Sequence, residues 1–349
     1  MKQIKLSKIT SVLLSAALAV PVFSGMAVAS DISYFSKEAA GTTGADFLNL
    51  PVGARAVGMA GAYSSVAEDA SAIYWNPAGL VQIPKLSAMF MRSEYVDDIS
   101  YQYAAYAQRL SYDSVIGISF MMTDIGTIEG MDKSRNSIGS FNPQDQVFTL
   151  SYSKAILEFS NKDLDVSMGL NAKYIKSEIR DSATAFAGDM GIMTFNFGAI
   201  PYRIGVVVSN IGKGLKYDQA SDPLPVTARF GGSINPFDNL LIAADVVVPK
   251  GNKMNIQTGV EAYINPNELT RLTARAGIDM QQMQDGFSGI SLGIGATLQF
   301  FTLDYAFVPM GELGNTHRIS LSFDFPFRSP IFQRRDRSVF TDMKGLSFK

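Results

Sequence analysis

The sequence predicts an all-β protein, namely a transmembrane β-barrel of about 14 antiparallel strands with an N-terminal hatch, or plug, inside the lumen. Three observations lead to this fold class. The chain begins with an export signal, a long series of segments then alternates between apolar and polar residues, and the connections between these segments are alternately short and long. Together they describe an exported chain that meets lipid with strands rather than with helices.

Residues 1–29 have the pattern of a cleaved signal peptide. Lysines begin the segment, an apolar stretch follows over 9–23, and a small-x-small cleavage site stands at 27–29. An uncleaved membrane anchor is the competing interpretation, but Pro21 interrupts the apolar stretch and no charged stop follows it. The mature chain is therefore expected to begin near Ser30.

Composition narrows the choice of fold and partner. The 349 residues include no cysteine, which excludes a disulfide framework, a thiolate metal site and a lipoprotein anchor. The formal charge of -2 is close to neutral and predicts no nucleic-acid partner. After the signal, no apolar run approaches the roughly 18 residues that a membrane helix needs. The expected partner is the lipid of the outer membrane.

The main body, residues 85–325, is read as the barrel. Its candidate strands are about 9 to 14 residues long, as a tilted membrane strand requires, whereas a soluble β-sandwich, the alternative, usually has strands of about five or six residues. In 205–208 and 245–248 the alternation fades, which is expected where the inner face of a strand touches an apolar plug. The candidates are 86–95, 100–110, 114–124, 146–156, 165–178, 185–197, 202–210, 225–234, 239–248, 254–263, 270–279, 289–298, 300–308 and 317–325.

The connections indicate which end of the barrel faces outward. Membrane barrels have short periplasmic turns and longer external loops. The predicted outer side includes the two longest connections, 125–145 and 211–224, whereas the inner side carries compact turns such as Asn265-Pro266-Asn267. Aromatic residues near the strand ends are expected to form belts at the two membrane interfaces: Tyr95, Tyr101, Tyr112, Tyr263, Phe300 and Phe301.

The segment 30–84 precedes the first strand and is expected to form the hatch. Its central stretch, Gly53 to Leu80, is rich in Gly, Ala and Ser, which let backbone pack closely against backbone. A nucleotide-binding loop is disfavoured, because Met59 stands where a phosphate loop needs lysine. The candidate site residues are those of the hatch motif: Gly53, Arg55, Gly58, Gly61, Asp69, Trp75, Asn76, Pro77, Ala78 and Gly79.

Little regular structure is expected within the hatch. We predict one helical turn near 45–48 and a helix from about 68 to 74. Pro77 prevents that helix from continuing, because proline lacks the backbone N–H and clashes with the preceding turn.

Two motifs at opposite ends of the mature chain resemble those of the PorV/PorQ family of outer-membrane proteins, whose barrels are similar to that of FadL. The first is G-A-R-A-x-G-M-x-G-A-Y from Gly53, followed by A-x-D-A-S-A-I-Y-W-N-P-A-G-L from Ala67; the second is the closing run 303–320. The resemblance implies a fourteen-stranded barrel with an N-terminal hatch, in which Asn76-Pro77-Ala78 corresponds to the motif that FadL-like hatches share. The basic tail, 326–349, departs from barrels that finish on an aromatic-ended strand.

Few residues suggest chemistry. His317 is the single histidine, and a strand sends His317 and Ser320 to opposite faces, so a Ser–His pair is not formed there. A pair of His317 with Ser291 on a neighbouring strand stays open at this stage. Asp97 and Asp98 could bind calcium, although paired acids at a barrel rim are more often solvated. We therefore expect no enzyme activity, no cofactor and no metal.

Two functions follow from the resemblance. Family members include components of the type IX secretion system that receive exported proteins at the cell surface, which suggests a role in protein export or surface presentation, with loops 125–145 and 211–224 as contact surfaces. FadL proper moves hydrophobic molecules, which suggests transport of a hydrophobic ligand as the alternative; a barrel without cargo is a third. An apolar cavity beside the hatch that leads to a gap between strands would favour ligand transport.

Overall fold

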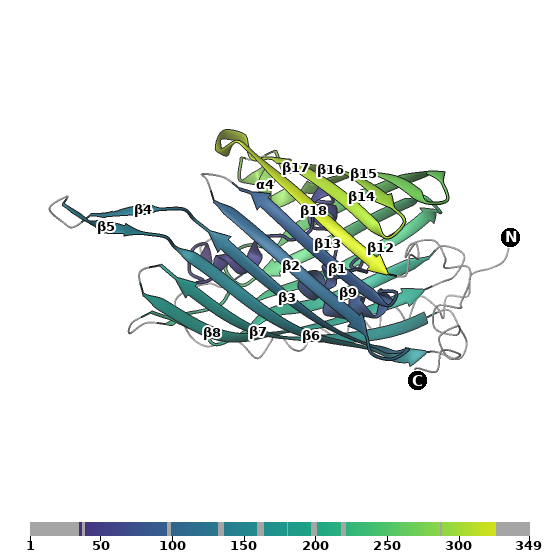
Figure 1. Ribbon diagram of the computed structural model, residues 1–349, viewed down its shortest axis with the longest axis horizontal. Helices are drawn as coiled ribbons and strands as arrows, with labels where there is room; N and C mark the ends of the chain where they lie inside the picture. Colours follow the sequence, from purple (N-terminus) through teal and green to yellow (C-terminus); the bar gives the residue numbers. More distant parts are fainter. Residues whose placement is uncertain are drawn as a thin grey trace.

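The computed structural model describes residues 35–36, 39–95, 99–131, 136–158, 164–179, 181–196, 201–217, 221–286 and 288–325, and in these residues the chain forms a closed barrel of fourteen antiparallel strands (Figure 1). The barrel strands are β1 (Leu86–Glu94), β2 (Ser100–Arg109), β3 (Ser114–Asp124), β6 (Gln144–Glu158), β7 (Leu164–Glu178), β8 (Ser182–Asn196), β9 (Tyr202–Gly212), β12 (Thr227–Phe237), β13 (Leu240–Pro249), β14 (Asn255–Asn267), β15 (Thr270–Asp279), β16 (Ile290–Leu298), β17 (Phe301–Pro309) and β18 (Asn315–Phe325).

Each barrel strand pairs with the strands that precede and follow it in the barrel, and β1 pairs with β18 to close the ring. The register at the closure joins Leu86 to Phe325 and Glu94 to His317. Every segment predicted to be a strand overlaps one of these barrel strands. The predicted fold class is confirmed.

The alternation of the sequence becomes an inner and an outer face of the wall. On β18, Ile319 and Leu321 are about half exposed on the outside, while Arg318, Ser320 and Ser322 are buried in the lumen. An apolar exterior and a polar interior are expected of a barrel that crosses lipid. None of the helices in the described residues is long and apolar enough to span a membrane.

The two ends of the barrel differ as predicted. At one end, pairs of strands are joined by turns of two residues, such as 238–239 and 268–269. At the other end, which the connection lengths assign to the outside, β4 (Ile128–Met131) and β5 (Ser137–Phe141) form a hairpin that projects well beyond the wall (Figure 1). The second long loop behaves differently. Its strands β10 (Leu215–Lys216) and β11 (Ser221–Asp222) fold inward, and Leu215 and Leu224 are buried.

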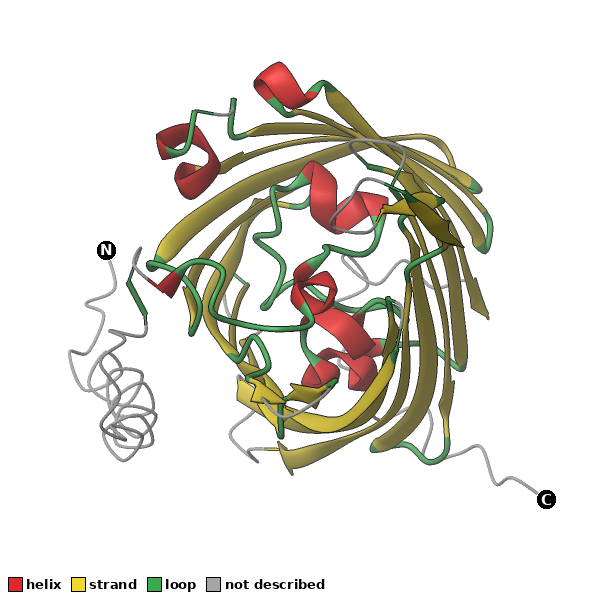
Figure 2. Ribbon diagram, turned by 90° about the vertical axis from the view of Figure 1, so that its left-hand side faces the viewer, coloured by secondary structure: helices red, strands yellow, loops and turns green. Residues whose placement is uncertain are grey.

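Residues 39–83 lie inside the barrel (Figure 2). Their elements are η3 (Asp46–Asn49), α2 (Ala54–Gly58), α3 (Ala72–Trp75) and η4 (Pro77–Gln82). The segment runs the length of the lumen, because the Gly44 N–H donates to the Pro223 carbonyl in an outward loop, whereas the Lys85 N–H donates to the Phe325 carbonyl at the opposite end. We call residues 39–83 the hatch from here on.

One prediction within the hatch needs correction. The helix predicted from about 68 to 74 is a single turn at Ala72–Trp75, because Glu68 and Asp69 are held by side-chain contacts described below. The helix does end before Pro77, as predicted. The predicted turn near 45–48 is present as η3.

The prediction of aromatic belts is also only partly correct. Tyr101 and Tyr263 point into the barrel rather than to the membrane, with 0% and 7% exposure. The Tyr101 hydroxyl donates to the Pro51 carbonyl of the hatch. Tyr112 and Phe301 are exposed on the outside, as predicted. The predicted signal peptide 1–29, the tail 326–349 and the acidic pair Asp97-Asp98 lie outside the described residues.

Candidate functional site

The candidate site is the hatch together with the wall residues that hold it, and its first feature is contact between small residues. Gly58 of α2 lies against Gly293 of β16 so closely that a Cβ built on Gly58 would be 3.0 Å from the Gly293 Cα. A Cβ on Gly277 of β15 would lie 2.3 Å from the Met59 carbonyl carbon. Since backbone cannot move aside as a flexible side chain can, glycine is required on this wall.

The Asn76-Pro77-Ala78 end of the hatch packs against β6, β7 and β8 on another part of the wall. A Cβ on Gly169 would lie 2.2 Å from the Pro77 carbonyl carbon, and one on Gly191 would lie 2.1 Å from the Asn76 Oδ1. Gly79 of the predicted hatch motif must also be glycine, because a Cβ at this position would lie 2.1 Å from the Ala67 carbonyl oxygen. The hatch and the wall are therefore complementary in shape, because wall glycines lie where the hatch approaches most closely.

Asn76 uses its side chain to join hatch and wall. Its Nδ2 donates to the Ser64 carbonyl at 2.8 Å and to the Ile192 carbonyl of β8 at 3.3 Å, while its Oδ1 accepts from the Ala78 N–H at 3.1 Å. Asn76 thus caps η4, whose first residue is Pro77. The Ala78 carbonyl accepts from the Ser167 hydroxyl of β7 at 2.8 Å.

The remaining motif residues have local roles. Gly53 and Gly61 adopt positive φ angles of 80° and 81°, which glycine tolerates without strain. Trp75 is buried, and its indole N–H donates to the Val52 carbonyl at 2.8 Å. The Asp69 Oδ1 accepts from both the N–H and the hydroxyl of Ser71, which fixes the turn before α3.

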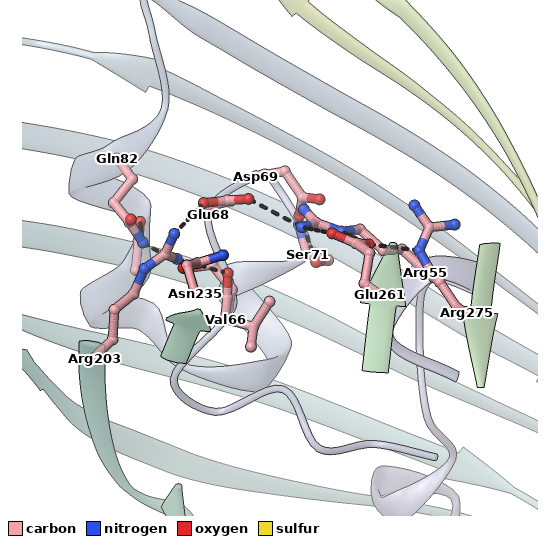
Figure 3. A network of polar contacts seen from close by, with 12 residues as sticks. Arg55, Val66, Glu68, Asp69, Ser71, Gln82, Arg203, Asn235, Glu261 and Arg275 are labelled. Atoms are coloured by element: carbon pink, nitrogen blue, oxygen red, sulfur yellow. Dashed lines mark hydrogen bonds and ion pairs between the residues drawn. The ribbon is translucent and has the colours of Figure 1, made fainter. Parts of the chain in front are cut away.

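A network of buried ion pairs crosses the lumen (Figure 3). At its centre, Arg55 Nη2 of the hatch lies 3.0 Å from Glu68 Oε1 and 2.8 Å from Glu261 Oε1 of β14. Glu68 Oε2 lies 3.0 Å from Arg203 Nη2 of β9. Hatch residues Arg55 and Glu68 thereby connect strands on two parts of the wall.

The network continues along the wall. Arg275 Nε of β15 lies 2.6 Å from Glu261 Oε2, and its Nη1 lies 2.7 Å from Asp304 Oδ1 of β17. The six side chains carry three positive and three negative charges, so the cluster is neutral as a whole. Neutrality matters because an unpaired charge in such a buried place would be costly.

Burial shapes the ionisation of the hatch groups. Burial by itself lowers the pKa of Arg55, but Glu261, Tyr63 and Glu68 outweigh it, and the pKa lies well above the ordinary value. Arg55 therefore stays charged. Burial raises the pKa of Asp69, and Arg55 and the hydrogen bonds from Ser71 offset only part of that rise.

A wall carboxylate also grips the backbone of the hatch. Asp245 of β13 is fully buried, and its Oδ2 accepts from the Ser64 N–H at 2.9 Å and from the Tyr63 N–H at 3.2 Å. The backbone of the hatch also lies directly against the backbone of the wall here, because a Cβ on Gly205 would lie 2.3 Å from the Ser64 carbonyl oxygen. Gly205 and Asp245 belong to 205–208 and 245–248, the two stretches where the alternation of apolar and polar residues fades.

The wall is continuous at the register shift between β8 and β9, one of several such shifts in the barrel. The register of β8 against β9 shifts between Gly188 and Met190. Polar side chains fill this place: Lys173 Nζ lies 2.8 Å from Asp189 Oδ2 and donates to Asn210 Oδ1 at 2.8 Å. The shift is therefore bridged by ion pairing and hydrogen bonds.

A cavity of about 390 Å³ lies between the hatch and the outward loops. Much of its lining is polar and includes Thr43, Asp46, Arg229, Asn255, Gln257, Asp279, Ser291 and Arg318. The cavity that would favour transport of a hydrophobic ligand was expected to be mainly apolar, and this cavity does not have that character.

The catalytic alternative left open by the sequence is wrong. His317 lies on the outer face of β18, where its Nδ1 is 2.7 Å from the Tyr305 hydroxyl oxygen. Ser291 is buried on the inner face of β16. The two side chains lie on opposite sides of the wall and cannot form a Ser–His pair. The described residues contain no cluster of three or more His, Asp or Glu side chains that could hold a metal ion.

All ten residues of the predicted hatch motif thus lie inside the barrel, in two groups on different parts of the wall. The wall partners of the hatch were missed by sequence reasoning, above all Arg203, Glu261, Arg275 and Asp304. The available signal was a charged residue at an inward position of an otherwise alternating strand, but its partner cannot be read from one sequence.

Solved structures that resemble this chain include barrels of the FadL family. The toluene transporter TbuX of Ralstonia pickettii is 12% identical with a TM-score of 0.51, and the match covers 79% of this chain and 98% of that chain. The toluene transporter TodX of Pseudomonas putida is 10% identical with a TM-score of 0.50, covering 78% and 96%. At these identities the likeness shows the fold alone.

Sequence comparison identifies the family. No curated protein matches the chain significantly. The model of the family described as type IX secretion system protein PorV matches residues 34–261, which is more than half of the 349 residues. The chain therefore belongs to the PorV family of type IX secretion system proteins, and it is an outer-membrane β-barrel.

Proposed function

We propose that this barrel serves type IX protein export without catalysing a reaction, by engaging an exported protein or a secretion-system component at its outward end while the hatch stays in the lumen. The observation that carries the proposal is the plugged lumen of a PorV-family barrel. Ion pairs, hydrogen bonds and close backbone contacts hold the hatch on several strands. A partner would then be recognised by surfaces outside the lumen.

The β4–β5 hairpin is the proposed contact surface. It projects beyond the rim (Figure 1), and Ile128 and Met131 are 42% and 61% exposed. A two-stranded hairpin is marginally stable alone in water, so contact with a partner would stabilise it. The loop 211–224 is a poorer candidate than the sequence suggested, because it folds onto the hatch.

Hydrophobic transport is the second candidate, and it rests on the fold shared with the toluene transporters TbuX and TodX. Two features count against it. The cavity beside the hatch has many polar side chains, and the shifted register between β8 and β9 is filled by Lys173, Asp189 and Asn210.

A disulfide between hatch and wall separates the two functions. The Ala54 N–H donates to the Ser320 hydroxyl at 3.1 Å, so these neighbouring positions are the pair chosen for a cysteine cross-link in a chain that has no cysteine of its own. We expect the cross-linked Ala54→Cys/Ser320→Cys variant to support export as well as its reduced form does.

The two single variants are the matched controls, and uptake of a labelled fatty acid is measured in the same cells. Loss of export on oxidation, restored by reductant, would contradict the fixed hatch. Fatty-acid uptake that disappears on oxidation would favour transport instead.

The hairpin is tested separately. Replacing Ile128 by Asp should reduce recovery of exported proteins with the barrel in a pull-down from outer membranes. The matched control is Ile319→Asp at an exposed position on the wall far from the hairpin, scored only if the barrel still assembles. Equal recovery with Ile128→Asp and with the unchanged chain would remove the hairpin from the proposal.

A further inference from the structure

The cavity above the hatch is bounded by three parts of the chain. The central hatch residues Gly61 and Trp75 contribute one side, the first hatch residues, 40–51, contribute another, and strands that include β12, β14 and β15 contribute the wall. Outward-loop residues such as Gln281 also line it. Its volume of about 390 Å³ is within the range of small-molecule sites, roughly 300–1,000 Å³.

A fixed row of polar side chains crosses the wall of this cavity. Arg229 Nη1 donates to Gln257 Oε1 at 3.0 Å, Gln257 Nε2 donates to Asp279 Oδ2 at 2.8 Å, and Asn255 Nδ2 donates to Asp279 Oδ1 at 2.9 Å. Asp279 Oδ1 also accepts from the N–H groups of Gln281 and Gln282 at the start of α4 (Met280–Gln284). Asp279 and Asn255 are more than nine-tenths buried, so the row is held in place before any ligand arrives.

The row leaves hydrogen-bonding capacity unused. Gln257 is the hydrogen-bond partner of Arg229 among the described residues, and a guanidinium has five N–H donors. The Arg229 side chain is oriented by Trp75, whose ring centroid lies 5.0 Å from the Arg229 Cζ. Ser291 also lines the cavity, is 4% exposed, and makes no hydrogen bond through its hydroxyl within the described residues.

The charged groups of the lining nearly balance. Two arginines, Arg229 and Arg318, face three carboxylates, Asp46, Asp279 and Asp285, so the formal sum is one negative charge. The lining also contains amide side chains, which both donate and accept hydrogen bonds. They are Asn49, Asn252, Asn255, Gln257, Gln281 and Gln282.

From these features we infer that the cavity is a binding site for a neutral, hydroxyl-rich solute of the carbohydrate class, taken up from the outward side. Adjacent hydroxyl groups of a sugar can each donate and accept, which matches a row of guanidinium, amide and hydroxyl groups. The Arg229 donors and the Ser291 hydroxyl are the expected contacts. The inference goes beyond the export role and does not depend on it.

The position of Trp75 provides the assay. It is the single tryptophan of the chain and lines the cavity, so its fluorescence reports on a ligand there. The full mature chain in detergent is titrated with three neutral trisaccharides, namely maltotriose, cellotriose and mannotriose, and with triglycine and decanoate for comparison. We expect a saturable change with at least one trisaccharide and none with triglycine or decanoate.

Variants establish where the ligand sits. Arg229→Met should weaken the apparent affinity about 10- to 100-fold, as expected for loss of hydrogen bonds from a charged donor, and Ser291→Ala should weaken it less. The matched control is Arg271→Met, because Arg271 also lies over an aromatic ring, 4.2 Å from the Tyr263 centroid, but does not line the cavity. Unchanged heat-modifiable mobility shows that each variant is folded.

Three results would overturn the inference: no saturable response to any trisaccharide, an equal response in Arg229→Met, or a response to decanoate or triglycine instead. Export measured with Arg229→Met is expected to remain at the level of the unchanged chain. A failed titration with normal export would therefore remove the sugar site and leave the export role untouched.

Discussion

The sharpest prediction concerns Glu68, the hatch carboxylate between Arg55 and Arg203. The buried network contains three arginines and three carboxylates. Glu68→Gln keeps the size of the side chain but leaves three positive charges against two negative ones. Glu68 is the carboxylate that Arg203 pairs with in the described residues, and Arg203 also donates to the Val66 carbonyl at 3.3 Å.

The expected cost follows from leaving a buried charge without its counter-ion. Breaking a buried pair by removing one partner typically costs about 3–5 kcal/mol. Because Glu68 is in the hatch, its loss should destabilise docking of the hatch in the lumen and should not weaken the pairing of the barrel strands. Urea titration in detergent, followed by Trp75 fluorescence, reports on the hatch, and heat-modifiable mobility reports on the barrel.

The double variant Glu68→Gln/Arg203→Met restores a neutral network of two positive and two negative charges. It should recover most of the stability lost in Glu68→Gln, since replacing both members of a buried pair is often close to neutral. A loss below about 1 kcal/mol in the single variant, or a double variant less stable than the single one, would refute the view that charge balance holds the hatch.

Three further predictions use the same fluorescence assay. Gly169→Ala should destabilise the hatch by about 1–3 kcal/mol, because its Cβ would meet the Pro77 backbone, whereas Gly232→Ala, with its nearest atom at 3.9 Å, should be close to neutral. Asn76→Asp should cost about 1–3 kcal/mol, since it replaces a donor that faces two carbonyls; unchanged stability would contradict the assigned hydrogen bonds. Burial raises the pKa of Asp69 in the folded hatch, so its contribution is favourable at low pH and is lost as pH rises from the ordinary Asp pKa to the raised one; Asp69→Asn should lack this component, and identical pH profiles would contradict it.

The barrel was predictable because its signal is local. Each strand must present apolar residues to lipid and small or polar residues to the lumen, so apolar residues recur at every second position of the strand. This alternation identifies all the barrel strands. Turn length and turn chemistry distinguish the two ends of the barrel in the same way. The position of an aromatic residue is less certain, because Tyr101 and Tyr112 look alike in sequence and only one of them points outward.

The site was predictable in part. The run of small residues and Asn76-Pro77 marked the hatch, but the partners of the hatch come from far along the chain. Arg55 and Glu261 are 206 positions apart, and no local pattern relates them. The same long-range contacts explain the helix that was predicted too long, because Glu68 is held by Arg55 and Arg203 instead of continuing a helical turn.

The distribution of these contacts bears on what the barrel can do. The first half of the hatch is anchored on β14 to β18 by Arg55 and α2, and the second half on β6 to β8 by Asn76 and Ala78. A rigid tilt of the hatch would break ion pairs on one side and force backbone into backbone on the other. Opening a path through the lumen would therefore require both groups of contacts to be lost together. Recognition at the outward rim, at the projecting β4–β5 hairpin or in the polar cavity, requires neither, which is why binding at the surface is the function this structure favours.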